Sequence, residues 1–332
     1  MTPLYTQNTG IIVKHKSDII YRSIRYKKTP LSVALLIGLL ISNFSMASDD
    51  NSVAPLATFD FAIAETLTAI GHPPGFLSGL TEYETYLRHD GILPSATNLG
   101  RRHFPNFELL ASLPPKHILI SPPLHINLLP KLREISSIKE YPIYNFSDSN
   151  DDQNHWEIVE ELTRQLGILV NDPDASERYI NQINHQFDDL KRQLNSIDEP
   201  LLIVRLVDER HARVFGKGGV EGMVLIRLGL QNAWQDDMGQ WGITNASVSS
   251  LFNIDAKIIF LESPFDPAGF QEQLLSDGQW RHLPSVKQNN YVILPLNYWQ
   301  WGGFPSALRF ANNLVSHVIE GGKANSTVEA NP

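Results

Sequence analysis

One long amphipathic helix, expected between residues 174 and 196, constrains the fold more than any other stretch of this chain. Its larger apolar side chains recur at steps of three and four residues, the spacing that lines one face of an α-helix; they are Tyr179, Ile180, Ile183, Phe187, Leu190 and Leu194. Asp172 and Pro173 favour a helix start, and Pro200 stops the pattern. At about 1.5 Å per residue such a helix spans roughly 30 to 35 Å, about the diameter of a small domain. A rod of this length can join two lobes.

The first 47 residues have the features of a cleaved secretory signal. Basic residues precede an apolar run from Leu31 to Ile41, and Ser45 and Ala47 are small residues at the two positions that a signal peptidase reads. The alternative is a transmembrane anchor, but the run falls well short of the roughly 20 apolar residues that a membrane span needs. The sequence therefore predicts an exported protein that loses residues 1–47.

Charge and cysteine content narrow the class of protein and its location. The chain has a formal net charge of -9. The predicted leader contains several basic residues and a single acidic residue, Asp18, so its removal leaves a more acidic mature protein. We therefore expect no nucleic-acid partner. The chain has no cysteine, which argues against a small disulfide-bonded module and against a lipid anchor. A monomer free in the periplasm fits these features best.

Residues 48–172 alternate short apolar runs with helical patterns, which predicts a lobe built on a parallel sheet with helices on both faces. We expect strands at 117–121 and 141–146, and helices at 62–71, 106–113, 128–135 and 156–166, the last of them ending at Gly167. Ligands on such sheets bind beyond the carboxyl ends of the strands, which directs attention to the loops.

Residues 198–322 predict a second α/β lobe. The expected strands are 200–207, 213–215, 257–261 and 291–294, and the expected helices are 220–228, closed by Gly229, and 306–319, ending at Gly321. A flexible tail, 323–332, follows. The predicted fold class is α/β, with two Rossmann-like lobes joined by one long rigid helix at 173–197.

Candidate ligand residues lie in the loops of both lobes. In the first lobe, Arg101 and Arg102 lie in a turn ahead of a helix, where a guanidinium can face an acidic ligand, although loop arginines are often solvated surface charges. Tyr83 and Tyr86 either line a rim or pack in the core. The second lobe holds a concentration of aromatic residues, four of which follow strands or lie in Gly-rich loops; the six are Trp234, Trp241, Trp280, Tyr298, Trp299 and Trp301. Such rings grip a bulky organic ligand at low entropic cost; the alternative is packing under a long loop.

The chain carries no recognisable catalytic motif. It lacks a G-x-S-x-G nucleophile elbow, an H-E-x-x-H motif, a P-loop and any cysteine nucleophile. Its eleven histidines include no close pair at metal-ligand spacing. We therefore expect a binding protein that is not an enzyme, with no catalytic residues and no directly bound metal.

From about Thr58 to Gly322 the chain resembles the periplasmic ferric-hydroxamate siderophore-binding proteins of iron-uptake ABC transporters. The residues that carry the resemblance are 98–110, 215–235, Trp241-Gly242 and 295–302. The resemblance implies a shallow ligand cleft between two lobes bridged by one helix. It also implies that the siderophore holds the iron, that no cofactor is needed, and that the partner is an inner-membrane ABC permease.

The same resemblance assigns the ligand residues. Arg102 matches the arginine that bonds the iron-bound hydroxamate oxygens, Trp241 and Trp299 match the cleft tryptophans, and Trp301 stands where a tyrosine is usual. The family's first-lobe tyrosine falls near Leu124, beside His125. The expected ligand-binding residues are Arg102, Trp241, Trp299, Trp301, Tyr298, Tyr86 and His125.

Several other functions remain open at this point. Within binding proteins, the ligand can be a catecholate or mixed citrate-hydroxamate siderophore, haem or a corrinoid. A catecholate complex carries about three negative charges, so it needs several basic residues in the cleft. Two alternatives belong to a different class of function. One is a sensor that binds the same ligand without supporting uptake, and the other is an exported siderophore-processing enzyme.

Overall fold

The computed structural model describes residues 55–87, 95–144, 155–194, 198–236, 238–239 and 241–326. These residues belong to one compact unit, Ser52–Pro332. The predicted signal peptide lies outside them, as does most of the predicted tail. Within the described ranges, no helix combines the length and the apolar character needed to cross a membrane.

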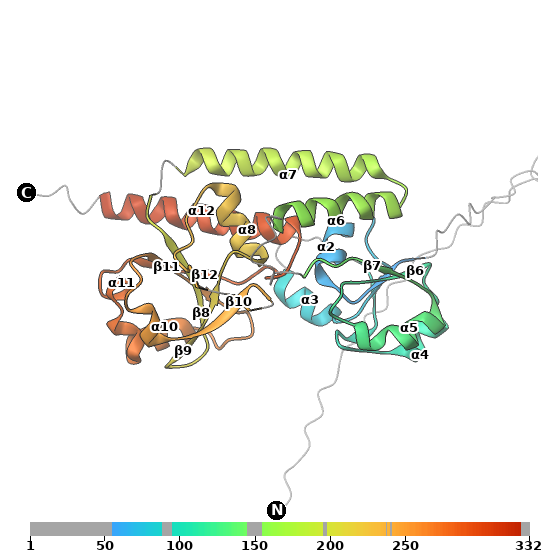
Figure 1. The fold of residues 1–332 in the computed structure, drawn as a ribbon, viewed down its shortest axis with the longest axis horizontal. Helices are drawn as coiled ribbons and strands as arrows, with labels where there is room; N and C mark the ends of the chain where they lie inside the picture. The colour runs from blue at the N-terminus through green and yellow to red at the C-terminus, as the bar shows by residue number, and fades with distance from the viewer. Residues whose placement is uncertain are drawn as a thin grey trace, which may run out of the picture. The chain divides into compact units, whose positions relative to one another are not determined.

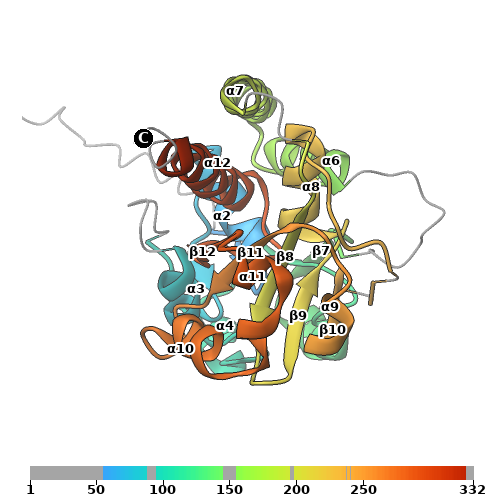
Figure 2. The ribbon, with the colours of Figure 1, turned by 90° about the vertical axis from the view of Figure 1, so that its left-hand side faces the viewer.

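The long predicted helix is present as α7 (Pro173–Gln193). The Asp172 side chain accepts a hydrogen bond from the Ala175 amide at 3.0 Å, and Pro173 occupies the first turn, so the helix begins as its sequence predicts. Its apolar face packs on α6 (His155–Leu169), α8 (Gly219–Leu228) and α12 (Phe304–Ser326). In Figure 1 α7 runs across the elements of both lobes, and Figure 2 shows it end-on beside α6, α8 and α12.

The first lobe is built on a five-stranded sheet in which every neighbouring pair is parallel, as predicted. Its strand order is β3 (Thr97–Asn98), β2 (Phe76–Leu77), β1 (Ala57–Thr58), β6 (His117–Ile120) and β7 (Ser137–Glu140). Its other elements are α2 (Phe61–Ala69), α3 (Leu80–Leu87), α4 (Phe107–Ser112), a 3-10 turn (Ile126–Leu128), α5 (Leu129–Ile135) and the hairpin of β4 (Gly100–Arg101) and β5 (Phe104–Pro105).

Two of the predicted elements in this lobe differ from the structure by more than two residues. No strand forms over 141–144, the described part of the strand expected at 141–146, and the strand lies earlier, as β7, where Ser137–Glu140 pairs with β6. Tyr141 and Tyr144 are instead buried against α2 and α6 without forming a strand. The helix expected to end at Gly167 continues to Leu169. Gly167 is retained inside it because a Cβ there would lie 2.3 Å from the Ser176 hydroxyl oxygen of α7, so glycine permits the close approach of the two helices.

The second lobe also contains a five-stranded sheet. Its order is β10 (Ile243–Ser247), β9 (His211–Phe215), β8 (Leu201–Leu206), β11 (Lys257–Glu262) and β12 (Tyr291–Pro295). β8, β11 and β12 are parallel. β9 is antiparallel to β8, to which a tight connection joins it, and β10 is antiparallel to β9. The remaining short helical elements are α9 (Val248–Leu251), α10 (Phe270–Asp277), a 3-10 turn (Gln279–His282) and α11 (Pro284–Lys287).

The two faces of the second sheet bury separate apolar clusters. One cluster joins Ile203 and Phe215 to α7, α8 and α12, and the other joins Val204 and Val214 to Trp234 and Trp280. The last helix passes its predicted end at Gly321 and reaches Ser326, so the predicted tail begins inside α12. The predicted α/β class, with two sheets and one long connecting helix, is confirmed.

Candidate functional site

The loop that follows β12 brings residues of the two lobes together around Trp299. The Trp299 side chain is 4% exposed. Its ring centroid lies 4.9 Å from that of Phe61 on α2, 5.3 Å from that of Tyr86 on α3, and 5.2 Å from that of Trp301. A tryptophan of the second lobe is therefore packed against aromatic side chains of the first lobe.

Trp301 and Trp241 extend this aromatic group. The Trp301 indole nitrogen donates a hydrogen bond to the Trp241 carbonyl at 3.0 Å, and the Trp241 ring lies 5.9 Å from that of Tyr144. Gly242 has a φ of 67°, and a Cβ there would come within 2.9 Å of the Gly218 backbone. Glycine is thus required for the Trp241 loop to lie against the turn that precedes α8.

Arg102 lies at the centre of this group. It occupies the turn of the β4–β5 hairpin and is only 7% exposed, whereas its neighbour Arg101 is exposed. Its guanidinium carbon lies 4.5 Å from the Trp299 ring centroid and 4.8 Å from that of Phe61. Such cation–π contacts are worth about 2 kcal/mol when desolvated. The surface-charge alternative therefore describes Arg101 and not Arg102.

Asp60, another residue of the first lobe, forms an ion pair with Arg102. Its carboxylate caps α2 by accepting from the Ala62 amide at 2.9 Å, and it lies 3.8 Å from an Arg102 terminal nitrogen. The Tyr144 hydroxyl donates to the same carboxylate at 2.5 Å. Burial first, and then the Asp60 charge, raise the pKa of Tyr144 well above its usual value, so Tyr144 stays a neutral donor.

Glu65 was not singled out by the sequence, yet it fixes the loop that carries Trp299. It is buried on α2, and its carboxylate accepts from the Gly303 amide and from the Ser306 hydroxyl, the latter at 2.7 Å. Ser306 in turn accepts from the Trp299 amide at 3.0 Å. Burial raises the Glu65 pKa to about 7, opposed by the Ser306 hydrogen bond and by the Arg309 charge. The available sequence signal was a lone charged residue in an otherwise uncharged helix.

His125 lies beside Arg102 but makes a different kind of contact. It is 6% exposed, has a left-handed backbone with a φ of 65°, and stacks on His103 with ring centroids 6.0 Å apart. Burial first, and then the Arg102 charge, lower its pKa to about 3, so its ring is neutral at physiological pH. Neither ring nitrogen has a hydrogen-bond partner among the residues described.

Tyr298 is separated from the other predicted ligand residues. Its side chain is 0% exposed, its hydroxyl donates to Glu221 at 2.8 Å, and its ring lies 5.2 Å from that of Phe310 on α12. Adjacent residues of one loop thus point into different surroundings, with Tyr298 in the second-lobe core and Trp299 against the first lobe. Trp234 and Trp280 are also core residues, as their packing alternative predicted.

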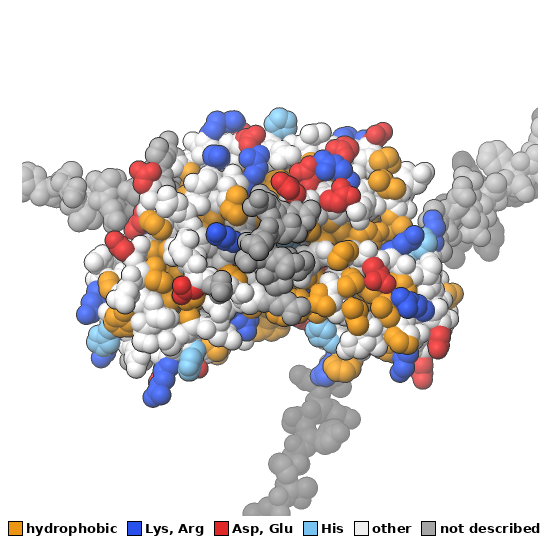
Figure 3. All heavy atoms as spheres, viewed as in Figure 1, with side chains coloured by type: hydrophobic (Ala, Val, Ile, Leu, Met, Phe, Trp, Pro, Cys, Tyr) orange, Lys and Arg blue, Asp and Glu red, His pale blue; other side chains and the backbone are white. Residues whose placement is uncertain are grey.

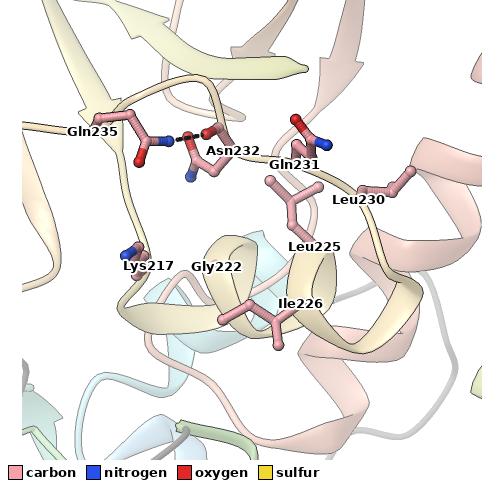
Figure 4. A pocket seen from close by; sticks show the side chains of 8 residues that line it. All are labelled: Lys217, Gly222, Leu225, Ile226, Leu230, Gln231, Asn232 and Gln235. Carbon is pink, nitrogen blue, oxygen red and sulfur yellow. Dashed lines mark hydrogen bonds between the residues drawn. The ribbon is translucent and has the colours of Figure 1, made fainter. Parts of the chain in front are cut away.

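A small hollow on the second lobe lies apart from these residues. Its volume is about 230 Å³. The residues that line it, shown in Figure 4, are Lys217, Gly222, Leu225, Ile226, Leu230, Gln231, Asn232 and Gln235. It has one basic side chain and no aromatic ring, so it offers little to a bulky organic ligand. The group around Arg102 and Trp299 has the more distinctive chemistry, and we take it as the candidate site.

Surface charge on one face of the molecule (Figure 3) does not single out another site. On the face seen in Figure 3, acidic and basic side chains are interspersed without a large patch of one sign. No cluster of three His, Cys, Asp or Glu residues in the described part of the chain could hold a metal ion.

The chain belongs to the periplasmic binding protein family, whose model matches residues 56–298. It is 24% identical to the iron(3+)-hydroxamate-binding protein FhuD of Escherichia coli over 89% of this chain and 96% of that protein. It is 20% identical to the Fe(3+)-citrate-binding protein YfmC of Bacillus subtilis over 67% of each. A crystal structure of FhuD from Vibrio cholerae with Fe3+-Desferal matches with a TM-score of 0.71 at 20% identity, over 81% of this chain and 98% of that one. The predicted family and fold are therefore confirmed.

Proposed function

We propose that this protein binds a ferric siderophore of hydroxamate type in the periplasm and delivers it to an inner-membrane ABC permease. The observation that carries the proposal is the surroundings of Arg102, a nearly buried guanidinium between the rings of Trp299 and Phe61. The names of the two FhuD relatives, which refer to an iron-hydroxamate and to Fe3+-Desferal, support the same class of ligand.

Arg102 retains donors for a ligand. Its Nε donates to the Phe59 carbonyl at 3.3 Å, and no other hydrogen bond from its guanidinium is made to a described residue. The 3.8 Å contact with Asp60 is an ion pair, longer than a hydrogen bond. A guanidinium has five N–H donors, so several can reach the electron-rich oxygens of a ferric hydroxamate centre. Trp241, Trp299, Trp301 and Tyr86 would cover its organic backbone.

The charge balance around Arg102 favours hydroxamate over catecholate at the position of the iron centre. Asp60 already neutralises Arg102, and the low pKa of His125 leaves that ring uncharged. A ferric catecholate, with about three negative charges, would enter this site at a high desolvation cost. The neutral His125 ring, stacked on His103, would present a nitrogen to the ligand where the family's tyrosine is expected.

The site is proposed to bind and not to transform its ligand. It joins an arginine, aromatic rings and a neutral histidine, without a nucleophile held beside a base. We therefore propose a monomeric carrier that needs no cofactor, its iron being held by the siderophore.

Binding is tested by mixing the protein with 55Fe-labelled ferric desferrioxamine B and separating bound from free label by gel filtration. We expect label to co-elute with the wild type and with Arg101→Ala, and to be lost with Arg102→Ala. Equal retention by all three would overturn the role of Arg102. Delivery is tested by 55Fe uptake in cells that lack the gene: restored uptake supports a carrier, and binding without restored uptake supports a sensor.

A further inference from the structure

Two arginines of the second lobe face each other across neighbouring strands. Arg205 on β8 is directly opposite Arg213 on β9 in the antiparallel register. Like charges in this position destabilise a sheet. Arg205 is neutralised by Asp266, whose carboxylate lies 2.6 Å from an Arg205 terminal nitrogen. The Arg213 side chain forms no ion pair and no hydrogen bond with any described residue, and its Nε is buried.

The position of this pair connects it with the candidate site. Arg205 and Arg213 project from the same face of the sheet as Ile203 and Phe215, near the carboxyl end of β8. Asp266, the partner of Arg205, follows Phe265, whose ring centroid lies 5.2 Å from that of Tyr86 of the first lobe. The Tyr86 ring lies 5.3 Å from that of Trp299, which also carries Arg102 on its surface. The Arg205–Arg213 pair and Arg102 therefore both lie near the same group of aromatic rings.

Arg213 is half-buried and its Nε is fully buried, which makes its lack of a partner informative. Its surroundings lower the pKa of the guanidinium, by burial first and by the Arg205 charge second. A guanidinium nevertheless remains charged in proteins, so the cost of burial is not relieved by loss of a proton. With Asp266 committed to Arg205, the pair keeps one net positive charge. A carboxylate can satisfy such a guanidinium with two parallel hydrogen bonds.

We propose that Arg213, supported by Arg205, binds a carboxylate of the siderophore while Arg102 holds the iron-bound oxygens. This inference rests on the proposed function and narrows its ligand to hydroxamate siderophores that carry a free carboxylate. A trihydroxamate without such a group would leave Arg213 unpaired.

The test uses ferric desferrioxamine B and two derivatives of its terminal amine. The acetylated complex has a neutral tail and the succinylated complex has a carboxylate, with the same iron centre. We expect the wild type to bind the succinylated complex about tenfold more tightly than the acetylated one, the order expected for a charged hydrogen bond.

Arg213→Gln is the decisive variant. It should abolish the preference for the succinylated complex and change the affinity for the acetylated complex less than about twofold, since it removes only the charged partner. Its stability should not fall, because it also removes a like-charge cross-strand pair. The matched control is Arg210→Gln, which should keep the preference for the carboxylate. Arg210 is an exposed arginine in the connection between β8 and β9.

The outcomes separate the inference from the function on which it rests. Acetylated and succinylated complexes that bind the wild type equally would overturn the carboxylate position alone. An Arg213→Gln variant that loses affinity for every complex by the same factor would do the same. A wild type that binds none of these complexes would overturn the hydroxamate function, and the carboxylate position with it.

Discussion

The two lobes contribute unlike surfaces to the candidate site. The first lobe supplies a charge whose partners are already in place, since Arg102 is held by Asp60, which in turn accepts from Tyr144. The second lobe supplies Trp241, Trp299 and Trp301 on loops, with Arg213 left unpaired among the described residues. Under the proposed function, the first lobe would recognise the iron centre and the second lobe would accommodate the organic part of the ligand.

The strongest way to break this comparison is to remove Asp60. Asp60→Ala leaves Arg102 buried without its acid and removes the cap of α2, so we expect the free energy of unfolding to fall by about 3 to 5 kcal/mol. Urea denaturation measures the loss. Asp174→Ala, in the exposed first turn of α7, should cost less than about 1 kcal/mol. Similar losses for the two variants would show that Arg102 does not depend on Asp60.

The Glu65 carboxyl joins the two lobes, and the dependence of stability on pH tests that connection. Its pKa is about 7 in the folded protein against a usual 4.5, so the stability contributed by the neutral carboxyl is full below pH 4.5 and is lost as the pH rises through 7. Glu65→Gln should therefore match the wild type near pH 5 and gain roughly 2 to 3 kcal/mol on it by pH 8. Denaturation at several pH values measures the difference.

The control for this pH effect is Glu221→Gln. Glu221 also has a pKa raised to about 7 by burial, but its partner Tyr298 belongs to the second lobe. Both variants should show the same dependence of stability on pH. Ligand affinity should change more for Glu65→Gln, because Glu65 bonds Gly303 and Ser306 on the side of the loop that faces the first lobe, whereas Glu221 bonds Tyr298 in the second-lobe core. A difference in stability that stays constant from pH 5 to pH 8 would contradict the raised pKa of Glu65.

The substitution Arg102→Ala removes the guanidinium that the first lobe contributes to the candidate site. We expect ferric desferrioxamine B to bind more weakly by more than about 1.5 kcal/mol, the lower limit for a hydrogen bond to a charged group. Isothermal titration calorimetry measures the affinity, and Arg101→Ala is the matched control because its side chain is exposed. Unchanged affinity in Arg102→Ala would remove the first lobe from recognition of the iron centre.

The smallest effect is expected from Trp301→Phe in the second lobe. The change keeps an aromatic ring but removes the hydrogen bond to the Trp241 carbonyl, which should cost about 0.5 to 1.5 kcal/mol of stability. Affinity for the same complex should fall no more than about threefold, because rings on this surface are adaptable. A loss as large as that of Arg102→Ala would mean that Trp301 also fixes the iron centre.

The sequence predicted the elements whose signals are local. The spacing of apolar residues and the Asp172-Pro173 start were enough for α7, and continuous apolar runs were enough for β6, β8, β11 and β12. The true position of β7 was missed because its pairing with β6 defines it. The β4–β5 hairpin was missed because its two-residue strands are too short to give a periodic pattern.

Side-chain surroundings were harder to predict than elements. Arg101 and Arg102 are adjacent, yet one is exposed and the other is packed between two rings. Tyr298 and Trp299 are likewise adjacent, yet only Trp299 contacts the first lobe. Such differences depend on contacts between residues far apart in the chain. For the same reason, the bond from Glu65 to Gly303 had no signature in the sequence beyond a charge in an apolar helix.

The most direct test of the central claim is a titration of the purified protein with ferric hydroxamate, ferric catecholate and iron-free siderophore, followed by tryptophan fluorescence. Trp299 and Trp301 lie at the proposed site, so we predict saturable, iron-dependent quenching by the hydroxamate at about micromolar concentration or below. A response to the catecholate, and none to any hydroxamate, would contradict the account.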